Sequence, residues 1–445
     1  MTSFLDDYLA YTAAHGTPER IECMLCDLNG ILRGKWIPGA AADKLATGHV
    51  RLPLSTYAPN ILGEEVPASG LGIVVGDPDG ALVPLPGTLK PVPWSKSAAQ
   101  VLVEMTELDG TPSPVSPREV LGAVLARYSE RGWHPVVATE LEFYIVQKRA
   151  APDQPPVPPE PNYAAQNYDL EALSHHDDML TEILEACAAQ GLATDTLVAE
   201  YGPGQFEINF HHTGDVFAAA ETALLFRRVV REVVDGHGLE ATFMAKPYAD
   251  SPGNGMHAHV SCLDDAGNNV FAAPQGVGPR LGHAIAGVLA TMPDLQAIFA
   301  PHLNSYRRFQ PMAFAPSAPD WALDNRAAGI RVPATDGKAA RLEHRIAGAD
   351  VNPYLALAAI LGGMLWGIER ETPLPLARDA EGAVPAERLT ADWATAVESF
   401  AASEIAAEIF GTLYRDAYAA VRRDEIAKLT TQITRLEYRT YLTRL

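Results

Sequence analysis

The stretch "VVATELEFYIV", Val136–Val146, places two acidic residues inside an otherwise apolar run. In a strand, side chains two positions apart lie on the same face, so Glu140 and Glu142 are expected to point the same way. An ionised carboxylate is costly to bury unless a positive group holds it. The stretch therefore predicts a positive partner on that face of the strand.

The same pattern recurs along the chain. Glu200 and Glu207 flank a Gly-Pro-Gly turn in "VAEYGPGQFEINF", and Glu343 lies in "AARLEHRIAG". His257 and His259 share one face of "GNGMHAHVS", after a glycine-rich turn. Oxygen-rich sites with an occasional imidazole suit Mg²⁺ or Mn²⁺, whereas zinc prefers Cys and His. The carboxylates are more than one ion needs, so the pattern predicts two divalent ions that share the cluster.

Several arginines accompany these motifs, in "NSYRRF", in "DNRAAGIRVP" and on either side of Glu343. They are Arg307, Arg308, Arg326, Arg331, Arg341 and Arg345. Guanidinium groups are the preferred planar binders of carboxylate and phosphate. Together with the acidic motifs they indicate an enzyme that handles a polyphosphate and an acid substrate. The chain has no GxxxxGK[ST] motif, so a P-loop is not the nucleotide cradle.

The overall composition excludes several classes of partner. The 445 residues carry a formal net charge of -21, which argues against binding nucleic acid or an anionic membrane. No apolar stretch approaches the roughly 20 residues of a membrane span, and the acidic start of the chain is unlike a signal peptide. Cys23 and Cys26 form a lone CxxC pair that we interpret as reduced thiols. The composition therefore predicts a cytoplasmic protein.

The first part of the chain, from residue 20 to about 107, is predicted to form short strands separated by turns. Hairpins are expected around Asn29-Gly30 and across Asp77–Gly80. A proline-rich stretch follows, and Ser116 is then the expected N-cap of a helix that ends near Arg131. A domain boundary is placed near residue 112.

Helices and strands alternate in the rest of the chain. Helices are expected over about 171–190 and 215–235, with a strand pair across "LVAEYGPGQFEINF" and a strand at "EATFMAKP". The apolar stretch "NPYLALAAILGGMLWGI" predicts a buried helix. The predicted fold class is α+β, with a small domain over 1–112 and a large domain over 113–445.

The motifs resemble those of the glutamine synthetase superfamily, type I. The run "KPYADSPGNGMHAHVS" is similar to the ATP-site signature of that family, and "ELEF", "EYGPGQFE", "NSYRR", "NRAAGIRVP" and "RLEHR" also occur in the family's order. The resemblance covers almost the whole chain. It implies a β-grasp-like N-terminal domain and a catalytic domain with a carboxylate-lined antiparallel half-barrel surrounded by helices. It also implies a homo-oligomer, a dodecamer of two hexameric rings, in which the N-terminal domain of one subunit caps the active site of the next.

The resemblance also implies roles for individual residues. One metal ion would be held by Glu142, Glu200 and Glu207, and the other by Glu140, His257 and Glu343. ATP would be bound by His259, Ser261, Arg326, Arg331 and Arg341. Glutamate would be bound by Gly253, Arg308 and Arg345, and the arginines that take part in catalysis would be Arg308, Arg326 and Arg345.

The implied reaction uses ATP and two or more Mg²⁺ (or Mn²⁺) ions and has two steps. The γ-carboxylate of L-glutamate attacks the γ-phosphate of ATP and gives γ-glutamyl phosphate. An amine then displaces phosphate and forms an amide. Metal ions and arginines would neutralise the charge that builds on the transferring phosphoryl group.

The sequence departs from the family where glutamine synthetases bind ammonium. Phe314 stands at the position of the glutamate in the flap after "NSYRR", and Pro53 stands where the N-terminal domain usually has an aspartate. Pro252 replaces the usual asparagine before Gly253. A phenyl ring cannot accept a proton from NH₄⁺, but it can line a slot for the carbon chain of a larger amine. Phe314 and Pro53 are therefore the candidate amine-pocket residues.

The phrases "DLNGILRGKWIP", "GLGIVVGDPDG" and "PLPGTLKPVPW" are similar to the γ-glutamylpolyamine synthetase branch of polyamine catabolism, which includes γ-glutamylputrescine synthetases. The predicted function is an ATP-dependent ligase that joins glutamate to putrescine or another polyamine. Three alternatives stay open: a ligase for a monoamine such as ethanolamine or methylamine, a glutamine synthetase that uses ammonia, and a non-catalytic structural ring. The contact for the distal ammonium of a diamine is not identified from the sequence.

Overall fold

A computed structural model describes residues 3–107, 109–310 and 313–445. The N-terminal part forms a six-stranded sheet in the order β2-β1-β6-β4-β3, with β5 paired to β6. Its strands are β1 (Arg20–Cys26), β2 (Leu32–Pro38), β3 (Arg51–Pro53), β4 (Asp79–Pro84), β5 (Lys90–Pro91) and β6 (Ala98–Thr106). The prediction of short strands in this region is confirmed.

Of the two hairpins expected in this sheet, one is confirmed and one is wrong. Strands β1 and β2 pair antiparallel across the turn that contains Gly30, which has a φ of 74°. The segment before β4 is not a strand, because Ile73–Val75 form a short 3-10 helix. Gly72 and Gly76 flank that helix with φ of 86° and 84°, and their left-handed backbone closes a turn instead of extending the chain.

The larger sheet has eight strands in the order β12-β13-β14-β11-β7-β9-β8, with β10 paired to β7. They are β7 (Trp133–Gln147), β8 (Thr194–Ala199), β9 (Gln205–Phe210), β10 (Leu239–Thr242), β11 (Met256–Asp264), β12 (Trp321–Leu323), β13 (Ile330–Ala334) and β14 (Arg341–His344). The predicted strand Val136–Val146 lies within β7, near the centre of this sheet. The predicted pair β8 and β9 is also present.

The strand expected at "EATFMAKP" is shorter than predicted, because β10 ends at Thr242. The Asn254 side chain donates hydrogen bonds to the carbonyl oxygens of Thr242 and Met244, at 3.3 and 2.9 Å. These carbonyl groups are thus bound by a side chain and not by a neighbouring strand. The chain leaves the sheet at this point and leads to the glycine-rich turn.

The described helices belong to both parts of the molecule: the first two in sequence pack with the N-terminal sheet, and the others belong to the part that contains the larger sheet. They are α1 (Phe4–His15), α2 (Ala42–Ala46), α3 (Pro117–Ser129), α4 (Leu170–Ser174), α5 (Asp177–Gln190), α6 (Val216–Gly236), α7 (Pro279–Thr291), α8 (Gln296–Phe299), α9 (Pro353–Glu369), α10 (Trp393–Ala402), α11 (Glu404–Phe410), α12 (Thr412–Thr430) and α13 (Arg435–Tyr441). Ser116 caps α3 as predicted, by accepting a bond from the N–H of Glu119. The helix expected over 171–190 is interrupted, because the backbone of His176 leaves the helical region with a φ of -118°.

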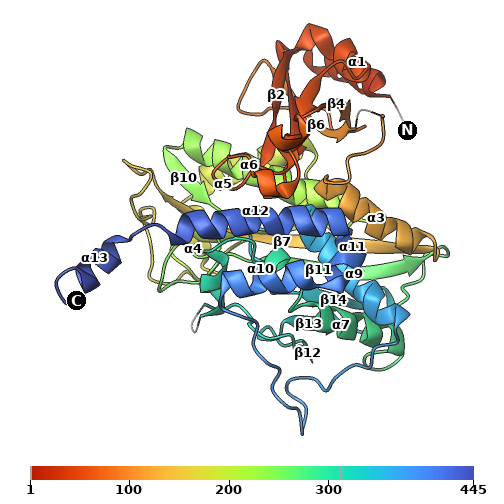
Figure 1. Cartoon of the computed structure of the whole chain (residues 1–445), viewed down its shortest axis with the longest axis vertical. Helices are drawn as coiled ribbons and strands as arrows, with labels where there is room; N and C mark the ends of the chain where they lie inside the picture. Colours follow the sequence, from red (N-terminus) through yellow and green to blue (C-terminus); the bar gives the residue numbers. More distant parts are fainter. Residues whose placement is uncertain (1–2, 108, 311–312) are drawn as a thin grey trace.

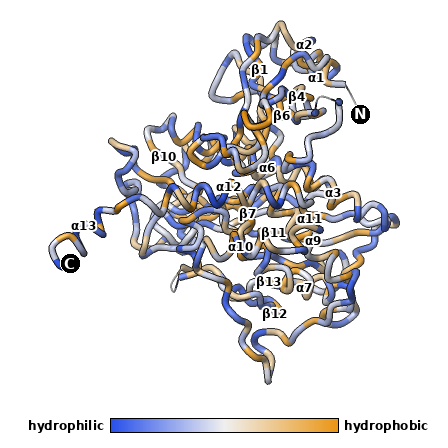
Figure 2. Tube along the Cα trace, in the orientation of Figure 1, coloured by the Kyte–Doolittle hydropathy of each residue, from blue (hydrophilic) through white to orange (hydrophobic). Residues whose placement is uncertain are grey.

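Helix α9 is the buried helix that the sequence predicts, and it is apolar along most of its length (Figure 2). Helices α3, α6, α7, α8 and α11 all contact it. Its approach to α7 requires glycine, because a Cβ atom at Gly287 would lie 2.2 Å from the carbonyl oxygen of Gly363. Residues of α9, of the helices around it and of the larger sheet form one buried hydrophobic cluster.

The N-terminal sheet lies at one end of the molecule, above α12 and the larger sheet (Figure 1). A buried cluster joins the two parts. Arg422 of α12 donates to Glu425 at 2.6 Å and also to the side-chain oxygen of Asn29. The backbone N–H of Ile61 donates to the other oxygen of Glu425 at 2.6 Å. The domain division at residue 112 itself stays a prediction.

The overall architecture confirms the predicted α+β class, with a small N-terminal sheet and a large, helix-covered sheet that is antiparallel except where β12 pairs with β13. In the described ranges, no helix combines the length and apolar character needed to cross a membrane.

Candidate active site

Strand register brings the acidic motifs together on one face of the larger sheet. Glu140 of β7 lies opposite His257 of β11, and Glu142 lies opposite Glu207 of β9. Glu343 of β14 lies opposite His259 on the other side of β11. The alternation of side chains along each strand therefore turns separate motifs into one site, as the sequence predicts.

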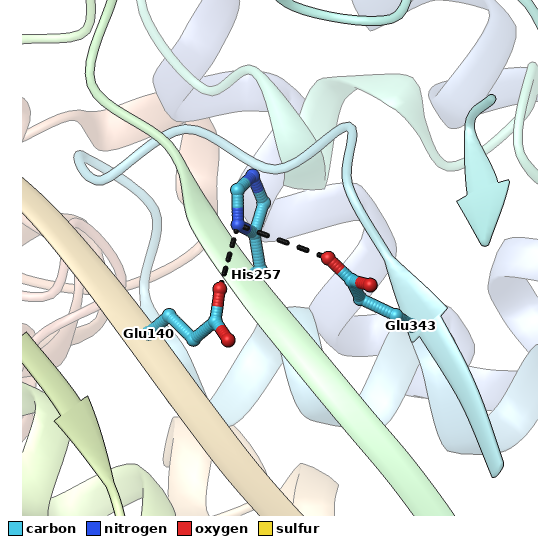
Figure 3. A group of neighbouring side chains, drawn as sticks. All are labelled: Glu140, His257 and Glu343. Carbon is cyan, nitrogen blue, oxygen red and sulfur yellow. Dashed lines mark hydrogen bonds and ion pairs between the residues drawn. The ribbon is translucent and has the colours of Figure 1, made fainter. Parts of the chain in front are cut away.

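The first cluster consists of Glu140, His257 and Glu343. Figure 3 shows the two carboxylates pointing toward the imidazole from strands on either side. Nδ1 of His257 lies 3.0 Å from Oε2 of Glu140 and 4.0 Å from Oε1 of Glu343. One ligand atom from each residue can be chosen so that all lie within 4.8 Å of one another. These three side chains could hold a metal ion.

The second cluster consists of Glu142, Glu207 and His257, whose ligand atoms also lie within 4.8 Å of one another. His257 therefore belongs to both clusters, whereas the sequence assigned it to one ion only. Glu200 belongs to neither cluster in the described part of the chain, although it was assigned to the second. Its carboxylate accepts a bond from the N–H of Tyr201 at 3.3 Å and lines the same cavity as Glu142.

Glu142, Glu200 and Glu207 lie close enough on this side of the sheet to repel one another. Burial, followed by the charge of Glu142, raises the pKa of Glu200 to about 7. Burial and the charges of Glu140, Glu142 and Glu200 raise the pKa of Glu207 well above its usual value. A divalent cation would relieve this repulsion, and the oxygen and imidazole donors suit Mg²⁺ or Mn²⁺.

Positive groups already hold the carboxylates of the first cluster. Burial opposes ionisation of Glu140, but hydrogen bonds with His257 and His259 outweigh it and lower the pKa of Glu140. Burial likewise opposes ionisation of Glu343, and the charges of His257 and Arg345 lower its pKa nonetheless. Arg331 also donates to Glu343 at 2.9 Å. Both carboxylates are thus kept ionised and able to bind a cation.

A cavity of about 480 Å³ borders the first cluster at Glu140. It is lined by four of the five residues that the resemblance assigned to ATP, which are His259, Ser261, Arg331 and Arg341. Nε2 of His259 lies 2.9 Å from Oε1 of Glu140, so the cavity and the cluster are directly linked. Lys338 also lines this cavity. Sequence reasoning missed it, although a lysine just before "AARLEHR" was a usable signal.

A second cavity, of about 600 Å³, borders the second cluster. It is lined by Gly253, Arg308 and Arg345, the three residues assigned to glutamate, and by Arg326. Arg326 was also assigned to ATP, but it does not line the cavity that holds the other residues of that group. A Cβ atom at Gly253 would lie 2.6 Å from the carbonyl oxygen of Ala245, so only glycine fits there.

Arg308 is buried at the second cavity and is only partly satisfied. It is 3% exposed, and its Nη1 donates to the carbonyl oxygen of Ile346 at 2.8 Å. Its Nε has no hydrogen-bond partner among the residues that the structure describes. A buried guanidinium with a spare donor is a suitable binder for a carboxylate.

The two candidate amine-pocket residues lie in different places. Phe314 lines the second cavity. Pro311 and Met312, which belong to the same flap segment, lie outside the described residues. Pro53 pairs with Asp79 in the N-terminal sheet and lines neither cavity. Tyr201 also lines the second cavity and was missed, because the motif "EYGPGQFE" was interpreted only through its two glutamates.

The fold and the site together define a class of protein. Residues 114–441 match the family model "Glutamine synthetase, catalytic domain", and the chain therefore belongs to the glutamine synthetase family. The resemblance inferred from the sequence is confirmed.

Several relatives are similar to this chain over most of its length. It is 37% identical to the γ-glutamylputrescine synthetase PuuA of Escherichia coli (strain K12), over 98% of this chain and 94% of that protein. It is 34% identical to a glutamate–isopropylamine ligase of a Pseudomonas species, over 94% of this chain and 93% of that protein. Among solved structures, a GmaS/ADP complex matches with a TM-score of 0.86 and 29% identity, over 98% of this chain and 99% of that one.

Proposed function

We propose that this chain is an ATP-dependent ligase that joins the γ-carboxylate of L-glutamate to an organic amine, with putrescine or another polyamine as the acceptor. The observation that carries the proposal is the position of the two carboxylate–imidazole clusters between two cavities, one of them lined by buried arginines. The names of the relatives support an amine acceptor, since PuuA and the isopropylamine ligase are both named for one.

The residues at the clusters fit divalent metal ions. Glu142, Glu200 and Glu207 would hold one ion, which the raised pKa of Glu207 supports. Glu140, His257 and Glu343 would hold the other. When bound, Mg²⁺ or Mn²⁺ would neutralise negative charge on the phosphoryl group. Glu200 would need to turn toward Glu142 and Glu207 to join the site.

The cavity beside Glu140 is the proposed ATP site. His259 and Ser261 would line it from β11, and Arg331 and Arg341 would contact the phosphates. A helix or P-loop is not needed there, because arginines and backbone groups can supply the positive field. The GmaS structure with bound ADP is similar to this chain over nearly its full length, which supports a nucleotide site in this fold.

The cavity beside Glu142 is the proposed site of glutamate and amine. Arg308 would bind the α-carboxylate of glutamate through its guanidinium group, next to Gly253. Arg345 and Arg326 would stabilise the γ-acyl phosphate as it forms. Glu140 lines the first cavity, and Glu142, Glu207 and His257 line the second, so metal ions at the clusters would lie between a γ-phosphate in one cavity and a γ-carboxylate in the other.

Phe314 is proposed to favour an organic amine over ammonium, because its ring can pack against the carbon chain of the amine. The chain is proposed to have two domains, 1–112 and 113–445, and to form a dodecamer of two rings. In that dodecamer, Pro53 of one subunit would lie at the active site of its neighbour. Helix α13 supports such contacts, because it projects from the body with exposed Leu436, Tyr438 and Tyr441 (Figure 1). The four buried, unpaired cysteines fit the proposed cytoplasmic location.

Amine-dependent phosphate release tests the proposal. The protein would be incubated with glutamate, ATP and Mg²⁺, and the acceptor varied across ammonium, methylamine, ethanolamine, isopropylamine, putrescine, cadaverine and spermidine. Strong release with diamines and little with ammonium is expected. Phosphate release with monoamines only would support the ligase function but show that the acceptor is a monoamine and not a polyamine. Release with ammonium alone would favour a glutamine synthetase, and none with any acceptor would favour a non-catalytic ring.

A further inference from the structure

Two aromatic rings form a pair at the second cavity. Tyr201 lies in the turn between β8 and β9, and Phe314 lies in the flap segment far along the chain. Their ring centroids are 5.1 Å apart, with an angle of 47° between the planes. The residues remain 44% and 64% exposed, although both line the cavity. The pair therefore presents ring surface that the chain itself does not cover.

The backbone around this cavity is strained. Phe314 has a φ of 57°, a left-handed conformation that is unfavourable for an aromatic residue. Asn167 and Tyr168, which line the same cavity, have φ of 44° and 68°. These are three of the six non-glycine residues with positive φ in the described chain. Strain of this kind persists mainly where a structure holds a ligand or a reacting group, and here it places the Phe314 ring against Tyr201.

Both signs of charge line the cavity around the pair, since Arg308, Arg326 and Arg345 lie there with three carboxylates. The N–H of Tyr201 donates to the carboxylate of Glu200, which lines the cavity with Glu142 and Glu207. Seven arginines stack on aromatic rings elsewhere in the described residues, but none stacks on Tyr201 or Phe314. The faces of this ring pair are thus free for a cation that comes from solution.

We propose that Tyr201 and Phe314 form the contact for the second ammonium group of a diamine, so that Tyr201 determines acceptor specificity. One amino group of the diamine is directed at the glutamyl group near Glu200, and the other lies over the rings. Glu200 and Tyr201 are consecutive in the sequence. The Glu200 carboxylate and the Tyr201 ring can therefore contact the two amino groups of one short diamine. The inference rests on the proposed ligase function and assigns its acceptor class.

The test compares two acceptors that share a carbon chain. Putrescine has two amino groups, and n-butylamine replaces one of them by a methyl group. In Tyr201→Leu, which keeps apolar volume but removes the π-face, we expect kcat/KM for putrescine to fall about 5- to 30-fold, as loss of a cation–π contact implies. For n-butylamine we expect a change below about threefold. KM for ATP, whose proposed site is the other cavity, should not change.

Two further variants separate the ring contact from a general defect. Tyr201→Phe keeps the ring and should bring putrescine use back to within about threefold of the wild type. Phe314→Leu should repeat the selective loss, which makes the test independent of how well Tyr201→Leu folds. An equal loss for both acceptors, or no loss for putrescine, would overturn the inference.

The wild-type protein separates the inference from the function on which it rests. If the wild-type protein uses n-butylamine with the same kcat/KM as putrescine, the ligase function stands and the proposed cation contact is wrong. If it releases no phosphate with any amine, the ligase function fails, and the acceptor class fails with it.

Discussion

At the scale of single residues, Glu142 is the most direct test of the metal site. It belongs to the second cluster, and its carboxylate also accepts the N–H of Gly255 at 2.6 Å. Glu142→Ala should lower phosphate release by more than about 100-fold and weaken Mn²⁺ binding, because one anionic ligand is lost. Titration with Mn²⁺ and phosphate release would check both effects.

Glu381→Ala is the matched control, since Glu381 lies on an exposed loop away from the clusters. It should behave like the wild type in both assays. Turnover by Glu142→Ala within a few-fold of the wild type would refute the assignment of Glu142 to a metal ion.

Phe314 gives a second prediction at this scale. Phe314→Glu places a carboxylate where the ring now lines the cavity, so it should attract NH₄⁺ and weaken the slot for a carbon chain. The ratio of kcat/KM for ammonium to that for organic amines should rise about tenfold or more. Steady-state phosphate release with each acceptor measures it. An unchanged ratio would show that the flap does not select the amine.

Among the secondary-structure elements, α12 holds the N-terminal sheet against the body through Arg422. The side chain is fully buried with Glu425, and both are bonded to residues of the N-terminal part. Arg422→Ala should lower the free energy of unfolding by about 3–5 kcal/mol, because it leaves Glu425 buried without its partner. Urea denaturation followed by fluorescence would measure the loss.

The neighbouring Arg423 is the control for that prediction. It pairs with Glu398 at the surface, where the two side chains are 50% and 59% exposed. Arg423→Ala should change the free energy of unfolding by no more than about 1 kcal/mol. Equal effects of the two substitutions would mean that the buried cluster does not hold the two parts together.

Strand β6 and helix α3 are joined by Glu104, which should make stability depend on pH. Its carboxylate accepts bonds from Tyr57, at 2.8 Å, and from Ser116, and burial raises its pKa to about 7. A raised pKa means that the folded state holds the proton more tightly than the unfolded state. Its contribution to stability is therefore complete below about pH 4.5 and lost as the pH rises through 7.

Glu104→Gln stays uncharged, so it should gain stability relative to the wild type as the pH rises from 5 to 8. The gain has an upper limit of about 3 kcal/mol, at about 1.4 kcal/mol for each unit of pKa shift. Melting temperatures of both proteins across this range would detect it. A difference that does not vary with pH would contradict the shifted pKa.

The elements and the site differ in how far sequence can predict them. The facing of Glu140 and Glu142 follows from the two-residue period of a strand, so it was predictable. Positions set by turns were not, because the turn from Gly72 to Asp77 is held partly by Ser55, whose hydroxyl donates to the Asp77 carboxylate at 3.0 Å across 22 positions of the sequence. Two features of the site depend on the positions of loops, which the sequence does not predict. Arg326 lines a different cavity from the other residues assigned to ATP, and the ring of Tyr201 packs against that of Phe314.

At the scale of the whole molecule, the two parts of the fold have different tasks in the proposed enzyme. The larger sheet supplies both clusters, and its strands and the loops around them line both cavities. The N-terminal sheet contributes no residue to either cavity of its own chain, and Pro53 lies there. This placement supports a site completed by a second copy, in which α12 and its buried cluster fix the angle of the capping sheet.

The most direct test of the proposed ligase is identification of its product. We predict that the protein, incubated with L-glutamate, ATP, Mg²⁺ and putrescine, forms a γ-glutamyl amide of putrescine, together with one ADP and one phosphate for each amide bond. Mass spectrometry of the product, with ADP and phosphate measured in the same sample, would establish this. Hydrolysis of ATP without an amide product, or formation of glutamine alone when ammonium is also present, would contradict it.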